Sequence, residues 1–260
     1  MKIALIGSGN IATFYATRWQ AAGHSIVQVI SPTEEHAAIL ARALACPFST
    51  DIQDIVQDAD IYLLAVKDDV LLSLQNNQQL QNQFVIHTSG SLPSNLFIDI
   101  AAVSACLWPV YSIQKENLTQ IENIPLVASC HQEAAIPQLR LLAGAISEET
   151  YTLNDQQKGI AHLAAVFANN FTNHLLGIAN ELLVGHDIPK KLLEPMTRAT
   201  IEQSFRTNPF DLQTGPAIRN DEKILQKQGR QLVEHPLWQH IYEAMSTSIQ
   251  ETKKQRNRND

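Results

Sequence analysis

The stretch KIALIGSGNIA, residues 2–12, decides the fold. Its apolar run Ile3–Ile6 ends at a glycine, which indicates a short buried strand. The residues that follow, Ile11–Ala22, have the apolar spacing of a helix that stops at Gly23. The chain therefore opens with a strand, a glycine-rich loop and a helix.

The loop between this strand and helix has the form G-x-G-x-x-A. Gly7 permits a tight turn, Gly9 lets a ligand approach the backbone, and small Ala12 lets the helix pack close to the strand. A plain strand–turn–helix with small residues for packing is the alternative. The unpaired N–H groups and partial positive charge of the helix start favour a dinucleotide pyrophosphate. The expected contacts are Gly7, Ser8, Gly9, Asn10 and Ile11.

Strand and helix signals keep alternating through the first half of the chain. This alternation predicts an α/β fold, a Rossmann-like doubly wound and mostly parallel sheet with helices on both faces. Ser31-Pro32-Thr33-Glu34 is expected to open the second helix, with Ser31 as its N-cap. Strands are expected at 25–30, 48, 61–66 and 84–86, helices at 31–44, 51–57 and 70–80, and a weaker extension of the sheet at 103–107, 124–128 and 149–153 with a helix at 133–146.

The character of the sequence changes after Asn154. Residues 155–184 contain no proline and two glycines, which indicates one or two long helices. Further helices are expected at 192–205, 221–233 and 237–254. We therefore predict a dinucleotide-binding domain at 1–153 and an all-helical substrate and dimerisation domain at 154–260.

The end of the second strand bears on which dinucleotide binds. NAD sites usually carry an acidic residue there for the ribose hydroxyls, but this strand ends Val29-Ile30-Ser31-Pro32-Thr33. The hydroxyls of Ser31 and Thr33 are suited to a 2′-phosphate, so we expect NADP rather than NAD. Two features count against this choice, because no arginine is adjacent and Glu34-Glu35 would repel a phosphate if they pointed inward.

Ligands of open α/β sheets bind beyond the carboxyl ends of the strands. Two further segments, 65–67 and 87–90, fall there and are expected to line the nicotinamide half of the site. In the alternatives, Lys67 is only a solvated lysine, His87 caps the sheet edge, and residues 89–91 form an ordinary turn. The candidates for contact with the cofactor are Ala65, Val66, Lys67, Thr88 and Ser89, with Gly90 next to the substrate.

The long helix carries a row of polar residues on an otherwise apolar surface. At about 100° per residue, a regular helix places four of them within about 60° of one another and a fifth at the margin. They are Lys158, His162, Asn169 and Asn173, with Asn170 at the margin. Such a row needs hydrogen-bond partners or a cleft. His162 is the candidate proton donor or acceptor because histidine titrates near neutrality, and a satisfied histidine between domains is the alternative.

Residues 214–221, Thr-Gly-Pro-Ala-Ile-Arg-Asn-Asp, form a predicted turn. Arg219 is suited to clamp a substrate carboxylate bidentately. In the alternative, Asp221 caps the following helix and Arg219 is exposed.

Composition excludes several classes of partner. The 260 residues carry a net charge of −7, which argues against nucleic acid because phosphate binding needs a basic face. No run of apolar residues is long enough to span a membrane, and no metal is expected. Three cysteines without a C-x-x-C pair fit reduced thiols in a cytoplasmic protein.

The motifs together resemble a known family, the proteins assigned as NADP oxidoreductases that join a Rossmann-like domain to a helical C-terminal domain of unknown function. These are distant relatives of pyrroline-5-carboxylate reductase and of the 6-phosphogluconate dehydrogenase-like enzymes. The resemblance implies NADP as cofactor, a 6-phosphogluconate dehydrogenase C-terminal-like helical domain and a homodimer formed through the helices. It rests on residues 6–12, 59–69, 87–92, 108–112, 162–171 and 214–221, which follow one another in the right order.

The leading hypothesis is an oxidoreductase that transfers a hydride between NADPH and a small C=O or C=N substrate in an interdomain cleft. His162 would exchange the proton and Asn170 would orient the substrate, which would contact Ser89, Gly90, Asn169 and Arg219. Two alternatives stay open. One is a non-catalytic NADP-binding sensor or scaffold, and the other is a pyrroline-5-carboxylate reductase-like imine reductase.

Overall fold

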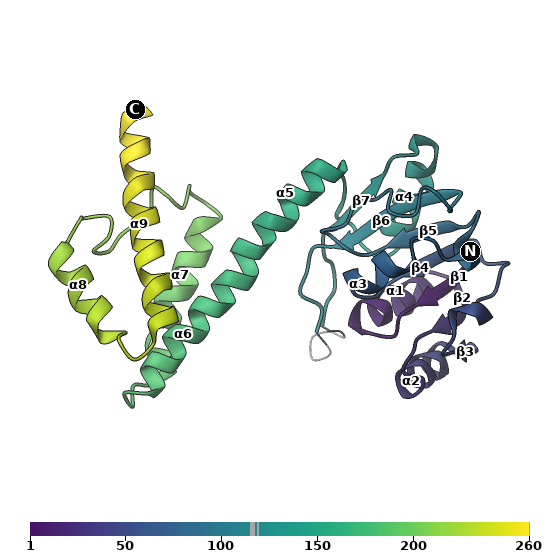
Figure 1. The fold of residues 1–260 in the computed structure, drawn as a ribbon, viewed down its shortest axis with the longest axis horizontal. Helices are drawn as coiled ribbons and strands as arrows, with labels where there is room; N and C mark the ends of the chain where they lie inside the picture. The colour runs from purple at the N-terminus through teal and green to yellow at the C-terminus, as the bar shows by residue number, and fades with distance from the viewer. Residues whose placement is uncertain (115–117, 119, 260) are drawn as a thin grey trace. The chain divides into compact units, whose positions relative to one another are not determined.

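A computed structural model describes residues 1–114, 118 and 120–259. The chain divides into two compact units, Met1–Asn169 and Asn170–Asp260. Figure 1 labels the elements, from the strands and helices of the first unit to the helices of the second. Each unit is described by itself.

The first unit is built on an eight-stranded sheet with the order β3-β2-β1-β4-β5-β6-β7-β8. All neighbouring strands are parallel except β6 and β7. The mostly parallel, Rossmann-like sheet predicted from the sequence is therefore confirmed. The strands are β1 (Lys2–Ile6), β2 (Ser25–Ile30), β3 (Phe48–Ser49), β4 (Ile61–Leu64), β5 (Phe84–His87), β6 (Val103–Pro109), β7 (Leu126–Cys130) and β8 (Thr150–Thr152).

Helices cover both faces of this sheet and form two cores. One core receives Tyr15 and Trp19 from α1 (Asn10–Ala21), together with side chains from α2 (Glu34–Leu44) and α4 (Ile136–Gly144). The other core lies on the opposite face, where Leu71 of α3 (Asp68–Ser73) packs. Two buried hydrogen bonds hold α1 in place. Tyr15 Oη donates to the Leu107 carbonyl of β6 at 2.8 Å, and Trp19 Nε1 donates to the Leu142 carbonyl of α4 at 2.9 Å.

Three local expectations were wrong. Thr33, not Ser31, is the N-cap of α2, and it makes no side-chain capping bond. The helix expected at 51–57 is a single 3-10 turn, Ile52–Asp54, capped by the Asp51 side chain. The helix expected at 70–80 is divided into α3 and a second 3-10 turn, Gln78–Leu80.

The helices after β8 begin with α5 (Asp155–Ala165), where Asn154 and Gln157 form a reciprocal capping box. A π-helical segment, Val166–Phe171, joins α5 to α6 (Thr172–Val184). The remaining helices are the 3-10 turn Lys190–Leu192, α7 (Glu194–Ser204), α8 (Glu222–Gln231) and α9 (Pro236–Asn259). Within the described part of the chain no strand follows β8, as the sequence predicted. The domain boundary expected at 153/154 stays a prediction. The two compact units described above meet between Asn169 and Asn170.

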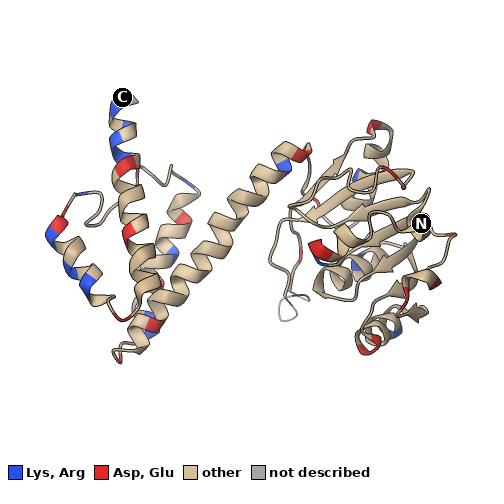
Figure 2. Cartoon of the chain, in the orientation of Figure 1, with Lys and Arg blue, Asp and Glu red and all other residues tan. Residues whose placement is uncertain are grey.

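The second unit has few buried side chains. Neither α6 nor α7 has a buried residue, and the buried apolar side chains among its described residues are Ala217 and Leu232. Its charge is concentrated in α8 and the C-terminal half of α9, whereas α6 is nearly uncharged (Figure 2). Among the described helices, none combines the length and the apolar character needed to cross a membrane.

Candidate active site

The glycine loop between β1 and α1 depends on Gly7. Its φ of 115° lies in the region that side chains rarely adopt, and its N–H donates to the Ile30 carbonyl at 2.8 Å. A Cβ at Gly7 would lie 2.3 Å from the carbonyl oxygen of Ala65, at the end of β4. Glycine is therefore required here by the protein itself.

Gly9 differs from Gly7 because the protein leaves space around it. A Cβ at Gly9 would meet no atom within 4 Å. Gly9 is exposed and precedes the first turn of α1, which contains no acidic residue. The free N–H groups of this turn suit an anion, and the bare Gly9 lets it approach the backbone. The loop thus fits the pyrophosphate of a dinucleotide.

The end of β2 faces this loop through a pair of serines. Ser8 Oγ and Ser31 Oγ are 2.7 Å apart, and Ser31 is buried. The Ser31 hydroxyl is thus bound to the glycine loop, which explains why Ser31 is not the N-cap of α2. Thr33 is exposed. The contact of these two residues with a 2′-phosphate stays a prediction.

The ends of β4 and β5 lie at the same edge of the sheet as the end of β1, as the parallel order requires. Ala65 and Val66 are half-buried, with the Ala65 N–H donating to the Ile6 carbonyl at 2.8 Å. Lys67 is exposed and is the N-cap residue of α3, without a side-chain capping bond. Its side chain is accessible to a ligand at this edge.

His87, the last residue of β5, has a structural role. It is fully buried, its Nε2 lies 3.0 Å from the Pro93 carbonyl, and its Nδ1 accepts from the Ser89 N–H at 3.2 Å. Burial, and then the nearby charge of Lys158, lower the pKa of His87 to about 4. The ring is therefore neutral near pH 7 and holds the following turn, close to the edge-capping alternative raised from the sequence.

The turn after His87 is tied together by serine hydroxyls. Ser89 Oγ accepts from the N–H groups of Ser91 and Leu92 at 3.3 and 3.2 Å. The Ser89 and Ser91 hydroxyls are 3.0 Å apart, and Ser91 Oγ donates to Asp68 at the start of α3. Thr88 and Ser89 are both buried. Within the described residues, the Ser89 hydroxyl is thus used by the turn.

His162 lies against this turn. A Cβ at Gly90 would be 2.6 Å from His162 Cδ2 and 2.6 Å from Trp108 Cε2, so glycine makes the close approach possible. The His162 and Trp108 rings are 5.4 Å apart at an angle of 58°. His162 is half-buried, and no hydrogen bond to its ring nitrogens is found within the described part of the chain. The structure therefore places the His162 ring next to Gly90, and the catalytic role of His162 stays a prediction.

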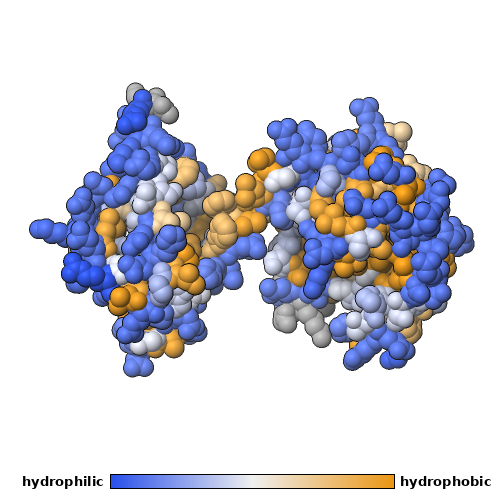
Figure 3. Space-filling model, in the orientation of Figure 1, coloured by the Kyte–Doolittle hydropathy of each residue, from blue (hydrophilic) through white to orange (hydrophobic). Residues whose placement is uncertain are grey.

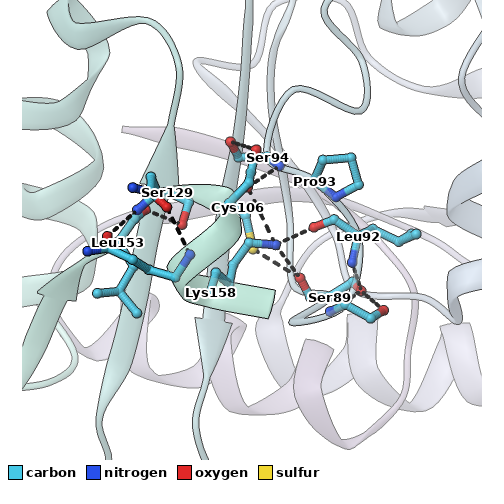
Figure 4. Close-up of polar contacts among 12 residues, drawn as sticks. Ser89, Leu92, Pro93, Ser94, Cys106, Ser129, Leu153 and Lys158 are labelled. Carbon is cyan, nitrogen blue, oxygen red and sulfur yellow. Dashed lines mark hydrogen bonds and ion pairs between the residues drawn. The ribbon is translucent and has the colours of Figure 1, made fainter. Parts of the chain in front are cut away.

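Lys158 lies one turn before His162 and is buried, with a side-chain exposure of 1%. Its Nζ donates to the Leu92 carbonyl and lies 3.5 Å from the Ser89 carbonyl and 3.7 Å from Asp155 Oδ1. Figure 4 shows the ammonium pointing at Leu92 and Ser89 of the turn, beside Cys106. The sequence marked Lys158 as one of a polar row, but it did not reveal this contact with the turn.

The other members of that row behave differently. Asn169, Asn170 and Asn173 are exposed. Asn169 and Asn170 lie within the π-helical segment, and Asn173 follows it. A regular 100° step therefore does not hold along the row, so the common face expected for it was wrong. Asn170 belongs to the second unit, as does Arg219.

Arg219 is exposed, and the Asp221 side chain caps α8 through the Ile224 N–H at 3.4 Å. This is the alternative that the sequence left open for the turn. The roles of Arg219, Asn169 and Asn170 toward a substrate stay predictions. Among the described residues, no group of His, Cys, Asp and Glu side chains is arranged to hold a metal ion.

Comparison with known families gives two matches along the chain. Residues 2–91 match a family described as NADP oxidoreductase, coenzyme F420-dependent. Residues 124–249 match a domain of unknown function, DUF2520. A search of curated proteins finds no match.

Solved structures extend the likeness over the whole chain. A candidate NADP oxidoreductase from Bacteroides fragilis, BF3122, is 32% identical with a TM-score of 0.86, and the alignment covers 96% of this chain and 98% of that one. An imine reductase from Myxococcus stipitatus in complex with NADP+ is 16% identical, with a TM-score of 0.71 and coverage of 98% and 94%. A 1-pyrroline-5-carboxylate reductase from Streptococcus pyogenes is 15% identical, with a TM-score of 0.61 and coverage of 96% and 98%. The last two show the fold alone.

Proposed function

The chain belongs to the same NADP oxidoreductase family as the Bacteroides fragilis protein, and from this premise we propose that it transfers a hydride between NADPH and a small C=O or C=N compound. The family, the enzyme class and NADP as cofactor agree with the expectations from the sequence. The reaction and the residues that perform it are our proposal.

The observation that carries the proposal is the placement of His162. Its ring lies over Gly90 and beside Trp108, next to the turn that follows β5. This turn and the glycine loop are at the same edge of the sheet, where dinucleotides bind in such folds. Among the described residues, the nitrogens of this half-buried imidazole have no hydrogen-bond partner, so the ring is suited to pass a proton to a substrate at that edge.

The cofactor supplies the hydride when it is bound. Gly7 and Gly9 shape the loop for its pyrophosphate, and Lys67 is placed at the adjoining strand end. In the reducing direction the substrate carbon takes the hydride, and its oxygen or nitrogen takes the proton that His162 gives up. Ser89 and Gly90, next to His162, are proposed to form a wall of the substrate site. Asn169, Asn170 and Arg219 remain the candidates from the sequence for holding the substrate.

Turnover of NADPH tests this proposal. The protein should enhance NADPH fluorescence and then oxidise NADPH with at least one member of a panel of cyclic imines, keto acids and aldehydes. His162→Ala should lower kcat by about 100-fold or more, the usual contribution of a general acid, without loss of NADPH binding. His24→Gln is the matched control because His24 lies between α1 and β2, at the opposite edge of the sheet. Binding without turnover across the panel would instead favour a non-catalytic NADP-binding protein.

We also propose that the helical unit pairs with a second copy of the chain. Large apolar side chains are exposed along it, among them Leu192, Met196 and Phe205, the last with 88% of its surface exposed. Apolar side chains are visible over the helical unit in Figure 3. Monomers rarely expose so much apolar surface, and a symmetric pair covers the same surface on both copies. Cytoplasm remains the expected location, in agreement with free thiols at all three cysteines.

Light scattering measures this association directly. The wild-type protein should have the mass of a dimer, and Phe205→Glu should shift it toward the monomer. Because Phe205 is almost fully exposed, its replacement removes little packing within the protomer. Lys227→Glu, an exposed charged position on α8, is the control. A wild-type monomer at micromolar concentration would contradict the pairing.

A further inference from the structure

Lys158 is the one charged residue among the buried side chains of the described chain. Removal of an ammonium group from water costs free energy unless hydrogen bonds and an opposite charge compensate it. A leucine or methionine would fill the same space at no such cost. The position therefore requires an explanation beyond packing.

Both hydrogen bonds of the Lys158 ammonium go to the turn that carries Gly90. Its Nζ donates to the Leu92 carbonyl and approaches the Ser89 carbonyl at 3.5 Å. The same Ser89 carbonyl accepts from Cys106 Sγ at 3.1 Å. These carbonyls have left the sheet, so the lysine supplies partners that a strand would otherwise provide.

Asp155 completes this attachment from the preceding turn of α5. Its Oδ1 accepts from the Ser94 N–H at 2.8 Å, and its Oδ2 lies 3.1 Å from Ser94 Oγ. His131 Nε2 is 2.8 Å from the same Oδ2, on the outer side. Asp155 thus holds Ser94 at the end of the segment, while Lys158 holds the carbonyls of Ser89 and Leu92. Figure 4 shows the contacts of Lys158 with Ser89 and Leu92.

His162 is on the same face of the helix as these two residues. With about 100° per residue, Asp155, Lys158 and His162 lie within about 60° of one another. All three precede the π-helical segment, so the regular step applies to them. The helix that carries the proposed proton donor is therefore fixed, one turn away, to the turn on which that donor rests.

We propose that Lys158 is a positioning residue for the reaction, with Asp155 as its partner. Lys158 holds the carbonyls of Ser89 and Leu92 so that Gly90 stays in contact with the His162 ring. It does not touch substrate or exchange a proton, because its donors are occupied by the turn and by Asp155. The inference rests on the proposed function only in that His162 is taken as the proton donor.

Lys158→Met keeps the length of the side chain and removes the charge and the donors. We expect kcat with a cyclic imine to fall by about 100-fold, the loss that a misplacement of about 1 Å causes. NADPH affinity, measured by fluorescence, should fall much less than kcat, because the glycine loop that is expected to hold the pyrophosphate is built by β1 and α1 and not by the turn that Lys158 holds. Lys2→Met, which removes an exposed lysine paired with Asp58 in the same unit, is the matched control and should leave kcat unchanged.

Hydrogen exchange followed by mass spectrometry gives a second readout that needs no substrate. The peptide that covers residues 87–94 should exchange faster in Lys158→Met than in wild type, whereas peptides from β1 and α1 should not. If Lys158→Met does not fold, Asp155→Asn removes the ion pair while its amide oxygen still accepts from Ser94. It should show the same changes to a smaller extent.

The outcomes separate the two proposals. A wild-type protein that turns over no substrate overturns the proposed function, and the exchange of residues 87–94 then still decides whether Lys158 holds the turn. Wild-type kcat in Lys158→Met, or unchanged exchange, overturns the role of Lys158. Equal losses of NADPH affinity and kcat would mean that Lys158 serves only the folded structure, and would also overturn it.

Discussion

The two units of this chain differ in where their apolar side chains go. The first unit encloses two cores, and the side chains of its central strands β1 and β4 are almost entirely buried. The second unit has Ala217 and Leu232 as its buried apolar side chains among the described residues, while Phe205 and others face outward. Hydrophobic burial is the main stabilising contribution to folding. The first unit therefore contains its own source of stability, whereas the second needs a surface to cover its helices.

Separate expression of the two units tests this difference most strongly. A fragment of residues 1–169 should unfold in one cooperative thermal transition, because both cores lie within it. A fragment of residues 170–260 should show no cooperative transition as a monomer, because helices without packing are marginal in water. Circular dichroism with light scattering on each fragment makes the measurement. A monomeric 170–260 fragment with a sharp transition would contradict the comparison.

Within the first unit, Gly7 and Gly9 separate stability from ligand binding. Gly7→Ala places a Cβ against the Ala65 carbonyl at positive φ, so we expect unfolding free energy to fall by about 1–3 kcal/mol. Gly9→Ala meets no protein atom, and it should leave stability unchanged or raise it by up to about 1 kcal/mol. NADPH affinity should nevertheless fall in Gly9→Ala, since the methyl group occupies the approach of the pyrophosphate. Denaturant unfolding and fluorescence titration distinguish the two, and unaltered NADPH binding in Gly9→Ala would count against the loop as the pyrophosphate site.

The core of the first unit should also respond to acid through His87. Its pKa is lowered from 6.5 to about 4 on folding, so the unfolded chain binds the proton more readily. The stability that this gives is complete above about pH 6.5 and decreases as the pH falls toward 4, by up to about 1.4 kcal/mol per pH unit. Denaturant unfolding of fragment 1–169 across this range measures the slope.

His87→Asn should reduce that slope. His24, whose pKa is also lowered by burial and by the nearby N-terminal charge, leaves a smaller slope of the same sign. Asp155 acts in a lower window, because its pKa is lowered by hydrogen bonds from Ser94 and His131 that outweigh its burial, and the stability it gives is lost only as the pH falls below its usual 3.8. An equal slope in wild type and His87→Asn between pH 6.5 and 4 would show that His87 is not buried in its neutral form.

Local patterns were sufficient for the parts of the fold that depend on neighbours in sequence. The apolar runs gave the strands, and the glycine spacing gave the loop, because both signals lie within a few residues. Ser31 was misjudged for the opposite reason. Its sequence context is that of an N-cap, but its hydroxyl has a partner at Ser8, in the glycine loop 23 residues earlier.

The site shows the same division. The sequence identified His162 as the residue with suitable chemistry. It placed Gly90 at the ligand-binding edge of the sheet, but it could not show that the two residues are in contact. The contacts of Lys158 could not be predicted, because the carbonyls that it meets come from a turn far away in sequence. The π-helical segment was missed because its sequence, VFANNF, has no feature that distinguishes it from an ordinary helix.

Cys106 gives the protein a built-in reporter of motion. Its thiol is buried under the Ser89 carbonyl, and burial raises its pKa to about 12. A thiol that is covered and protonated reacts with an alkylating reagent only after its surroundings open. Cys46 and Cys130 are half-exposed and would be modified first. The slow modification that remains would measure how often the turn beneath His162 lifts from the sheet.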